Sequence, residues 1–315
     1  MQGIENKTEN CRFMTLRFSP EILDALKEGA PVVALESTLV THGFPHPENL
    51  AIARESEQAI RAGGAVPATI ALVGGRPQIG LDEAQLAALA APGAQVVKAS
   101  VRDLAVCAAR GQSAGTTVAA TMRLAAQAGI ALFATGGIGG VHRGVSESWD
   151  ISADLTELSR SPVCVVSAGA KSLLDLPKTL EVLETLGVPV IGFGTDEFPA
   201  FYSRTSGIKL TARVDTPAEA AAVVAAHRAL GLPGGLLIVQ PIAENLALPA
   251  DEMERHIAAA QDAASREGVS GKALTPFILR YIAAATQGRT IEPNKALIRA
   301  NARLAAEIAC ALAAL

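Results

Sequence analysis

The stretch VCVVSAGAKSLLDLPKTLEVLETLGVPVIGF, residues 163–193, sets the fold class. Residues 163–167 and 188–193 are short apolar runs rich in Val and Ile, which predict buried strands. Residues 178–186 between them predict a helix. A strand, a helix and a strand in this order form the repeating unit of a parallel sheet covered by helices. The stretch therefore predicts an α/β fold.

The same alternation continues in both directions along the chain. Further strands are predicted at residues 32–35, 68–73, 96–99, 131–134 and 236–240, and helices at 47–62, 115–128, 218–229 and from 251 onward. The Gly74-Gly75 pair predicts a hairpin turn, so the mainly parallel sheet should contain one antiparallel excursion. Without a linker-like segment, residues 14–315 are predicted to form one domain. Met14 offers a second start, and residues 1–13 are predicted to be a disordered extension.

Composition excludes several classes of protein. A hydrophobic content of 50% with 18% charged residues is typical of a compact globule. A net charge of -4 argues against binding a nucleic acid polymer, which requires a concentrated positive field. The four cysteines lack CxxC spacing, so neither a zinc site nor a disulfide framework is indicated. With no secretory signal and no uninterrupted membrane span, we expect a cytoplasmic protein.

Ligands in α/β sheets bind at the carboxyl ends of strands, and three reactive side chains are predicted there. Glu36 directly follows a strand, where burial would raise the pKa of a carboxyl and suit it to general acid work; a structural ion pair is the alternative. Lys98 ends the strand VVKAS and Lys171 follows VCVVSAGA. A lysine at a partly desolvated strand end needs a partner or a role, although a surface lysine remains the alternative.

Four other segments carry weaker signals. Asp150 and Asp154 stand four residues apart around Ser152, a set of oxygen ligands that suits Mg²⁺ or Mn²⁺, unless Ser152 or Asp154 simply caps the next helix. The loop TGGIGGVHRG, residues 135–144, resembles a phosphate cradle but lacks the GxGxxG and P-loop patterns. His42 and His46 give little support for zinc because HExxH is absent. Residues 194–207 could form a substrate lid or a subunit contact.

Together these segments closely resemble the pseudouridine-5'-phosphate glycosidase family. The matching runs include VVALESTLVTHGFPHPEN from Val32, FATGGIGGVHRG from Phe133, SAGAKS from Ser167 and GKALTPFILRYIAAATQGRTIEPNKALIRAN from Gly271. The resemblance covers the chain from about Phe18 to the C-terminus. It departs at Trp149, where a smaller or sulfur-containing residue is expected, and at VKASVRD around Lys98.

The resemblance implies a three-layer α/β/α domain with a mixed, mainly parallel sheet, assembled as a homotrimer. It implies a lyase that reversibly splits the carbon-carbon glycosidic bond of pseudouridine 5'-phosphate into uracil and ribose 5-phosphate, in pseudouridine degradation. Lys171 would be the covalent nucleophile and Glu36 the proton donor. Asp150 would bind one Mn²⁺ ion, with Mg²⁺ as the alternative. The implied substrate-binding residues are Lys98, Val118, Ser152, Ala153, Asp154 and Asn294.

The chemistry of this bond explains why an amine is required. The bond joins ribose C1' to uracil C5, so the leaving atom has no lone pair to protonate, and the two-carboxylate strategy of ordinary glycosidases does not apply. A neutral Lys171 amine could instead add to C1' of the opened ribose and leave an imine after uracil departs. Two rival functions remain: another imine-forming enzyme acting on ribose 5-phosphate, such as an aldolase or isomerase, and a non-catalytic sugar-phosphate sensor.

Overall fold

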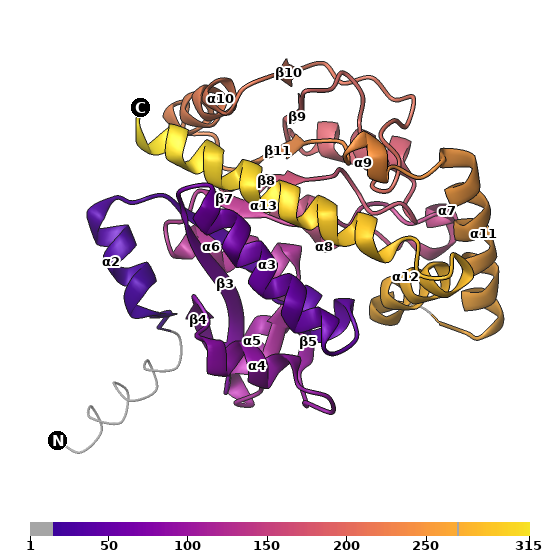
Figure 1. Ribbon diagram of the computed structural model, residues 1–315, viewed down its shortest axis with the longest axis horizontal. Coiled ribbons are helices and arrows are strands. Elements are labelled where there is room, and N and C mark those ends of the chain that lie inside the picture. The colour runs from indigo at the N-terminus through magenta and orange to yellow at the C-terminus, as the bar shows by residue number, and fades with distance from the viewer. Residues whose placement is uncertain (1–14, 270) are drawn as a thin grey trace.

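The computed structural model describes residues 15–269 and 271–315, and residues 1–13, predicted to be disordered, lie outside these ranges. The described residues contain an 11-stranded sheet with helices on both faces (Figure 1). The strands are β1 Arg17–Phe18, β2 Val32–Glu36, β3 Val66–Val73, β4 Arg76–Ile79, β5 Val97–Ala99, β6 Ala114–Thr116, β7 Leu132–Ala134, β8 Cys164–Ser167, β9 Val190–Phe193, β10 Arg213–Val214 and β11 Leu236–Val239.

The sheet is mixed and mainly parallel, as the sequence predicts. The strand order is β1-β4-β3-β2-β7-β8-β11-β9-β10, and β6, paired with β5, branches from β3. Only the pairs β3/β4 and β3/β6 are antiparallel among the described strands. The first of these pairs is the predicted hairpin, whose turn glycines Gly74 and Gly75 both have positive φ. The parallel strands thus direct their carboxyl ends to one edge of the sheet.

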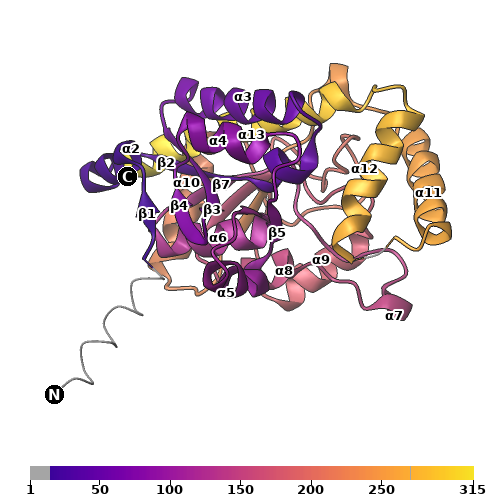
Figure 2. The same cartoon turned by 90° about the horizontal axis from the view of Figure 1, so that it is seen from below.

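The helices form two outer layers (Figure 2). On one side lie α3 Glu48–Ala62, α4 Glu83–Ala90 and α13 Ile291–Ala313, with α10 Pro217–Ala229 packed on α13. On the other lie α5 Val101–Ala109, α6 Val118–Gln127, α8 Ala153–Leu158 and α9 Leu176–Thr185. The remaining helices are α2 Pro20–Glu28, α7 Val145–Ser148, α11 Ala250–Arg266 and α12 Leu274–Ala285.

Side-chain alternation along the strands divides the core between the two faces. In β2, Val33 and Leu35 belong to the apolar cluster that includes the C-terminal half of α13, whereas Val32 and Ala34 belong to the cluster on the opposite face. All five β2 residues are buried, and the last of them is Glu36. The strand therefore carries a carboxyl group into the interior at the carboxyl edge of the sheet.

The largest correction to the predicted elements concerns residues 115–128. The helix begins only at Val118, and Ala114–Thr116 form strand β6 instead. Gly115 lies so close to Thr41 that a Cβ there would stand 2.1 Å from its Oγ1, a packing restriction that a sequence pattern does not show. The strands predicted from residue 163 and from residue 188 begin at Cys164 and Val190, and α4 and α5 were not predicted.

None of the helices within residues 15–269 and 271–315 combines the length and the apolar character that crossing a membrane requires. The apolar end of α13 instead packs against the sheet and α10.

Candidate active site

A pocket with a volume of about 320 Å³ opens at the carboxyl edge of the sheet. This volume lies at the lower end of the range of small-molecule sites, which is roughly 300–1,000 Å³. The pocket is lined by nearly all the predicted site residues, namely Glu36, Lys98, Val118, Asp150, Ser152, Ala153, Asp154 and Lys171. These residues come from segments far apart in the sequence. The topology therefore brings the predicted catalytic and substrate-binding groups to one place.

Glu36 occupies a deeply buried position in this group, at 7% exposed. Burial raises the pKa of its carboxyl, and nearby Lys171 and a hydrogen bond from the Thr135 hydroxyl oppose the rise only in part. Asn301 of α13 donates to the Thr135 carbonyl over 2.8 Å and so fixes the loop beside Glu36. This carboxyl can therefore hold a proton at a pH where an exposed glutamate cannot.

Lys171 lies in the loop after β8, and its side chain lines the pocket. Its Nζ donates to the carbonyl oxygen of Gly137 over 2.6 Å, so its hydrogen-bond partner is neutral rather than a carboxylate. The backbone is held by the same loop, because the Lys171 amide donates to the Ile138 carbonyl over 3.0 Å. A part-buried amine with a neutral partner is suited to nucleophilic attack on a carbonyl carbon.

His42 also lines the pocket, although the sequence singled it out only as a weak zinc candidate. It lies in a π-helical turn, η2 Leu39–Gly43, which follows the Glu36 strand. Burial lowers the pKa of its imidazole, and repulsion from Lys98 lowers it further by a smaller amount. Its Nδ1 contacts the Thr41 hydroxyl at 2.7 Å, and this hydroxyl donates to the Ser37 carbonyl over 3.2 Å. When the Thr41 hydroxyl donates to Ser37, the His42 ring donates through Nδ1 and Nε2 is an acceptor.

Asp154, the second carboxylate of the pair whose spacing suggested metal ligands, is held by the backbone of two other segments. Both of its carboxylate oxygens accept backbone hydrogen bonds, from Ala119 over 2.9 Å and from Gly139 over 2.7 Å. The Ser152 hydroxyl accepts from the Asp154 amide over 3.2 Å and caps α8, so the structural alternative is confirmed for Ser152. Asp154 thus joins the start of α6 to the glycine-rich loop.

Asp150 remains as a carboxylate on the pocket wall. Its Oδ2 lies 4.0 Å from Nδ1 of His142. Among residues 15–269 and 271–315, no three His, Cys, Asp or Glu side chains are grouped to hold a metal ion. A single carboxylate facing a pocket fits only a hard divalent ion that keeps most of its water ligands.

The glycines of the loop at 135–144 serve close packing. A Cβ on Gly137 would stand 2.8 Å from the Phe201 ring, and one on Gly140 would stand 2.5 Å from Thr179 Oγ1. Of its glycines, Gly139 alone lines the pocket within the described part of the chain. The loop is therefore a tightly packed wall of the site rather than an open cradle of glycine amides.

The wall formed by the C-terminal region was not predicted as a whole. Gly271, Thr275, Pro276 and Leu279, in and before α12, line the pocket. Asn294, expected to bind substrate, is half-buried on α13 and is not among the described residues that line the pocket, so its role stays a prediction. Tertiary packing brings α12 to the site, and no local sequence pattern predicts this. The family resemblance alone therefore pointed to the C-terminal region.

Comparisons with known proteins identify the family of the chain. The family model described as indigoidine synthase A like protein matches residues 21–311. The pseudouridine-5'-phosphate glycosidase of Paracoccus denitrificans is 56% identical over 95% of this chain and 98% of its own length. The enzyme of the same name from Deinococcus radiodurans is 55% identical over 98% of this chain and 99% of its own.

Two solved structures share the fold. The prealnumycin C-glycosynthase AlnA, solved in complex with ribulose 5-phosphate, superposes with a TM-score of 0.87 at 39% identity, covering 95% of this chain and 97% of its own. An indigoidine synthase A-like protein from Thermotoga maritima superposes with a TM-score of 0.85 at 36% identity, covering 96% and 97%. The chain therefore belongs to the indigoidine synthase A like family, the family of the pseudouridine-5'-phosphate glycosidases that it matches over nearly its whole length.

Proposed function

We propose that this chain catalyses the reversible cleavage of pseudouridine 5'-phosphate to uracil and ribose 5-phosphate, through an imine on Lys171. The observation that carries the proposal is the placement of the Lys171 amine and the buried Glu36 carboxyl in one pocket. The identity to curated glycosidases over nearly the full chain supports the substrate. The protein would then be a lyase that acts as a C-glycosidase in pseudouridine degradation.

The proposed reaction has three steps. The ribose ring opens at the C1'–O4' bond and the Lys171 amine bonds to C1'. A proton then reaches uracil C5 while the C1'–C5 bond breaks, and the new bond between C1' and the lysine nitrogen becomes an imine as uracil leaves. Water hydrolyses the imine, releases ribose 5-phosphate and restores the amine. Glu36, with its raised pKa, supplies a proton at O4' or at C5.

The direct test is to incubate the protein with uracil, ribose 5-phosphate and Mn²⁺, and to follow the product by mass. We expect pseudouridine 5'-phosphate to form. An aldolase or isomerase would change ribose 5-phosphate without consuming uracil, and a sensor would bind it unchanged. The homotrimer and the cytoplasmic location implied by the resemblance belong to the same proposal, and are tested by light scattering and cell fractionation.

We also propose that Asp150 holds one Mn²⁺ or Mg²⁺ ion, which when bound would organise water and substrate oxygens electrostatically. Removing divalent metal with a chelator should abolish activity, and Mn²⁺ should restore it. Asp150→Ala should resemble chelation, whereas Glu147→Ala, at an exposed carboxylate on α7, should have no effect. Full activity in the metal-free protein would contradict the metal assignment.

The substrate phosphate should contribute much of the orientation energy. Lys98 and Arg102 both line the pocket and can pair with an anion. Pseudouridine without its phosphate should therefore have a kcat/KM lower by roughly 10- to 100-fold for each charge-assisted hydrogen bond that the phosphate would have accepted. Lys98→Ala should impair the phosphorylated substrate much more than the nucleoside. Equal kcat/KM values for the two substrates in the unchanged protein would refute this prediction.

A further inference from the structure

Residues 194–209 form a loop between β9 and β10 and include residues 194–207, whose role the sequence left open between a substrate lid and a subunit contact. None of these residues lines the pocket in the described structure, so the loop does not cover the substrate site here. Its three aromatic side chains, Phe198, Phe201 and Tyr202, are at most 2% exposed. The loop therefore directs its aromatic side chains into the protein.

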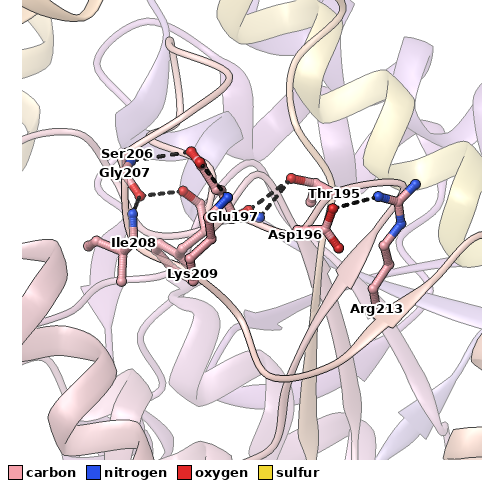
Figure 3. Close-up of polar contacts among 9 residues, drawn as sticks. Thr195, Asp196, Glu197, Ser206, Gly207, Ile208, Lys209 and Arg213 are labelled. Atoms are coloured by element: carbon pink, nitrogen blue, oxygen red, sulfur yellow. Dashed lines mark hydrogen bonds and ion pairs between the residues drawn. The ribbon is translucent and has the colours of Figure 1, made fainter.

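The outer part of the loop is braced by polar contacts (Figure 3). The Lys209 amine pairs with Glu197 at 3.0 Å, and the Arg213 guanidinium pairs with Asp196 at 2.8 Å. The Ser206 hydroxyl donates to the Phe198 carbonyl over 2.6 Å. These contacts hold the two arms of the loop together on its exposed side.

The inner part of the loop is anchored to the rest of the fold. The Ser203 hydroxyl donates to the Leu248 carbonyl over 2.8 Å, and the Leu248 amide donates to the Tyr202 carbonyl over the same distance. The rings of Phe201 and Tyr202 meet edge to face with centroids 4.8 Å apart. Phe201 has a φ of 62°, a left-handed conformation that a residue with a side chain adopts only when its surroundings impose it.

This anchored segment packs against Gly137, the hydrogen-bond acceptor of the Lys171 amine, and against Gly169, which precedes Lys171 in the chain. The Phe201 ring lies over Gly137, whose carbonyl accepts the Lys171 amine hydrogen bond. Gly169, two residues before Lys171, has a φ of +80°, and a Cβ there would stand 2.4 Å from the Pro199 carbonyl oxygen. Gly169 also forms a β-bridge with Ala200. The loop thus contacts both the acceptor of the lysine amine and the backbone that carries the lysine.

We propose that the inner part of this loop, residues 199–203, positions the Lys171 amine, and that Phe201 is its main positioning residue, acting through Gly137. The proposal deepens the function proposed above and rests on it. Phe201 is not among the described residues that line the pocket. It fixes the carbonyl that directs the nucleophile toward C1', where a displacement of about 1 Å can cost on the order of 10²-fold in rate.

The test compares Phe201→Ala, Phe201→Leu and Lys209→Ala, the last of which removes an exposed ion pair of the same loop. We expect Phe201→Ala to lower kcat, and the rate of borohydride-trapped adduct with ribose 5-phosphate, by roughly 10- to 100-fold, with KM little changed. Phe201→Leu should fall between this variant and the unchanged protein, and Lys209→Ala should match the latter. Rates are normalised to folded protein, so a loss of stability alone does not reproduce this pattern.

A second variant tests the contact itself. Gly137→Ala places a methyl group against the Phe201 ring and should also slow trapping. In the double variant Gly137→Ala/Phe201→Leu the smaller side chain should relieve the clash, so the double variant should trap faster than Gly137→Ala alone. An unaltered trapping rate in Phe201→Ala, an equal loss in Lys209→Ala, a change in KM alone or simple additivity of the two substitutions would each overturn the proposal.

Failure of the proposed function is recognised separately. In that case the unchanged protein would neither cleave pseudouridine 5'-phosphate nor trap ribose 5-phosphate. The loop proposal would then be judged by the rate at which trinitrobenzenesulfonate labels Lys171, measured by peptide mass. Labelling that is the same in Phe201→Ala and in the unchanged protein would reject it, and slower or faster labelling would support it.

Discussion

Lys171→Ala is expected to lose uracil release from pseudouridine 5'-phosphate by on the order of 10³-fold or more, because it removes the proposed covalent nucleophile. In the unchanged protein, borohydride added during turnover, or with ribose 5-phosphate alone, should reduce the imine. Peptide mass analysis should then find one pentose phosphate per chain, on the peptide that carries Lys171. The variant should show no such adduct.

Two other lysines serve as controls for this result. Lys98→Ala should weaken substrate binding and slow the reaction while the adduct still forms on Lys171. Lys178→Ala removes a lysine whose side chain is 59% exposed and paired with Asp175, and it should change neither rate nor adduct. If the adduct maps to Lys98, or if Lys171→Arg keeps appreciable activity, Lys171 is not the nucleophile.

The central strands of the fold were predictable because their composition is determined by burial. The strands β2, β3, β5, β7 and β8 were each predicted from an apolar run, and the predicted ends lie within a few residues of the observed ones. The two-residue strands β1 and β10 carry no periodicity, and they exist because β4 and β9 present free edges to them. Strand β6 was missed because Gly115 is required by contact with Thr41, which is distant in the sequence.

The site was predictable where a reactive side chain ends a strand or lies in the loop after it. Glu36 and Lys171 could be placed together because the carboxyl ends of parallel strands meet at one edge. The place of His42 in the pocket was not predicted, because it depends on the π-helical turn after Glu36. The hydrogen bonds of Asp154 could not be predicted either, since its partners Ala119 and Gly139 are brought to it only by the fold.

Glu36→Gln is expected to lower kcat by roughly 10²- to 10⁴-fold, the range for the removal of a general acid. Glutamine keeps the shape and can still accept the Thr135 hydrogen bond, but it has no acidic proton to transfer to the substrate. In the unchanged protein, activity should fall as pH rises through the raised pKa of Glu36, because the acid form is then lost. A variant within about tenfold of the unchanged protein would contradict the role of proton donor.

Stability gives the matched control for Glu36→Gln. Since burial raises the pKa of this carboxyl, the folded state favours its protonated form, and the stabilisation present at low pH is lost as pH rises through that pKa. Glutamine is uncharged at every pH, so the variant should be at least as stable as the unchanged protein in neutral solution, measured by thermal unfolding. An inactive but stable variant would therefore place the defect in proton transfer. If it still traps ribose 5-phosphate on Lys171 but releases no uracil, the missing proton is needed to cleave the nucleotide, whereas loss of both would place it at the opening of the ribose ring.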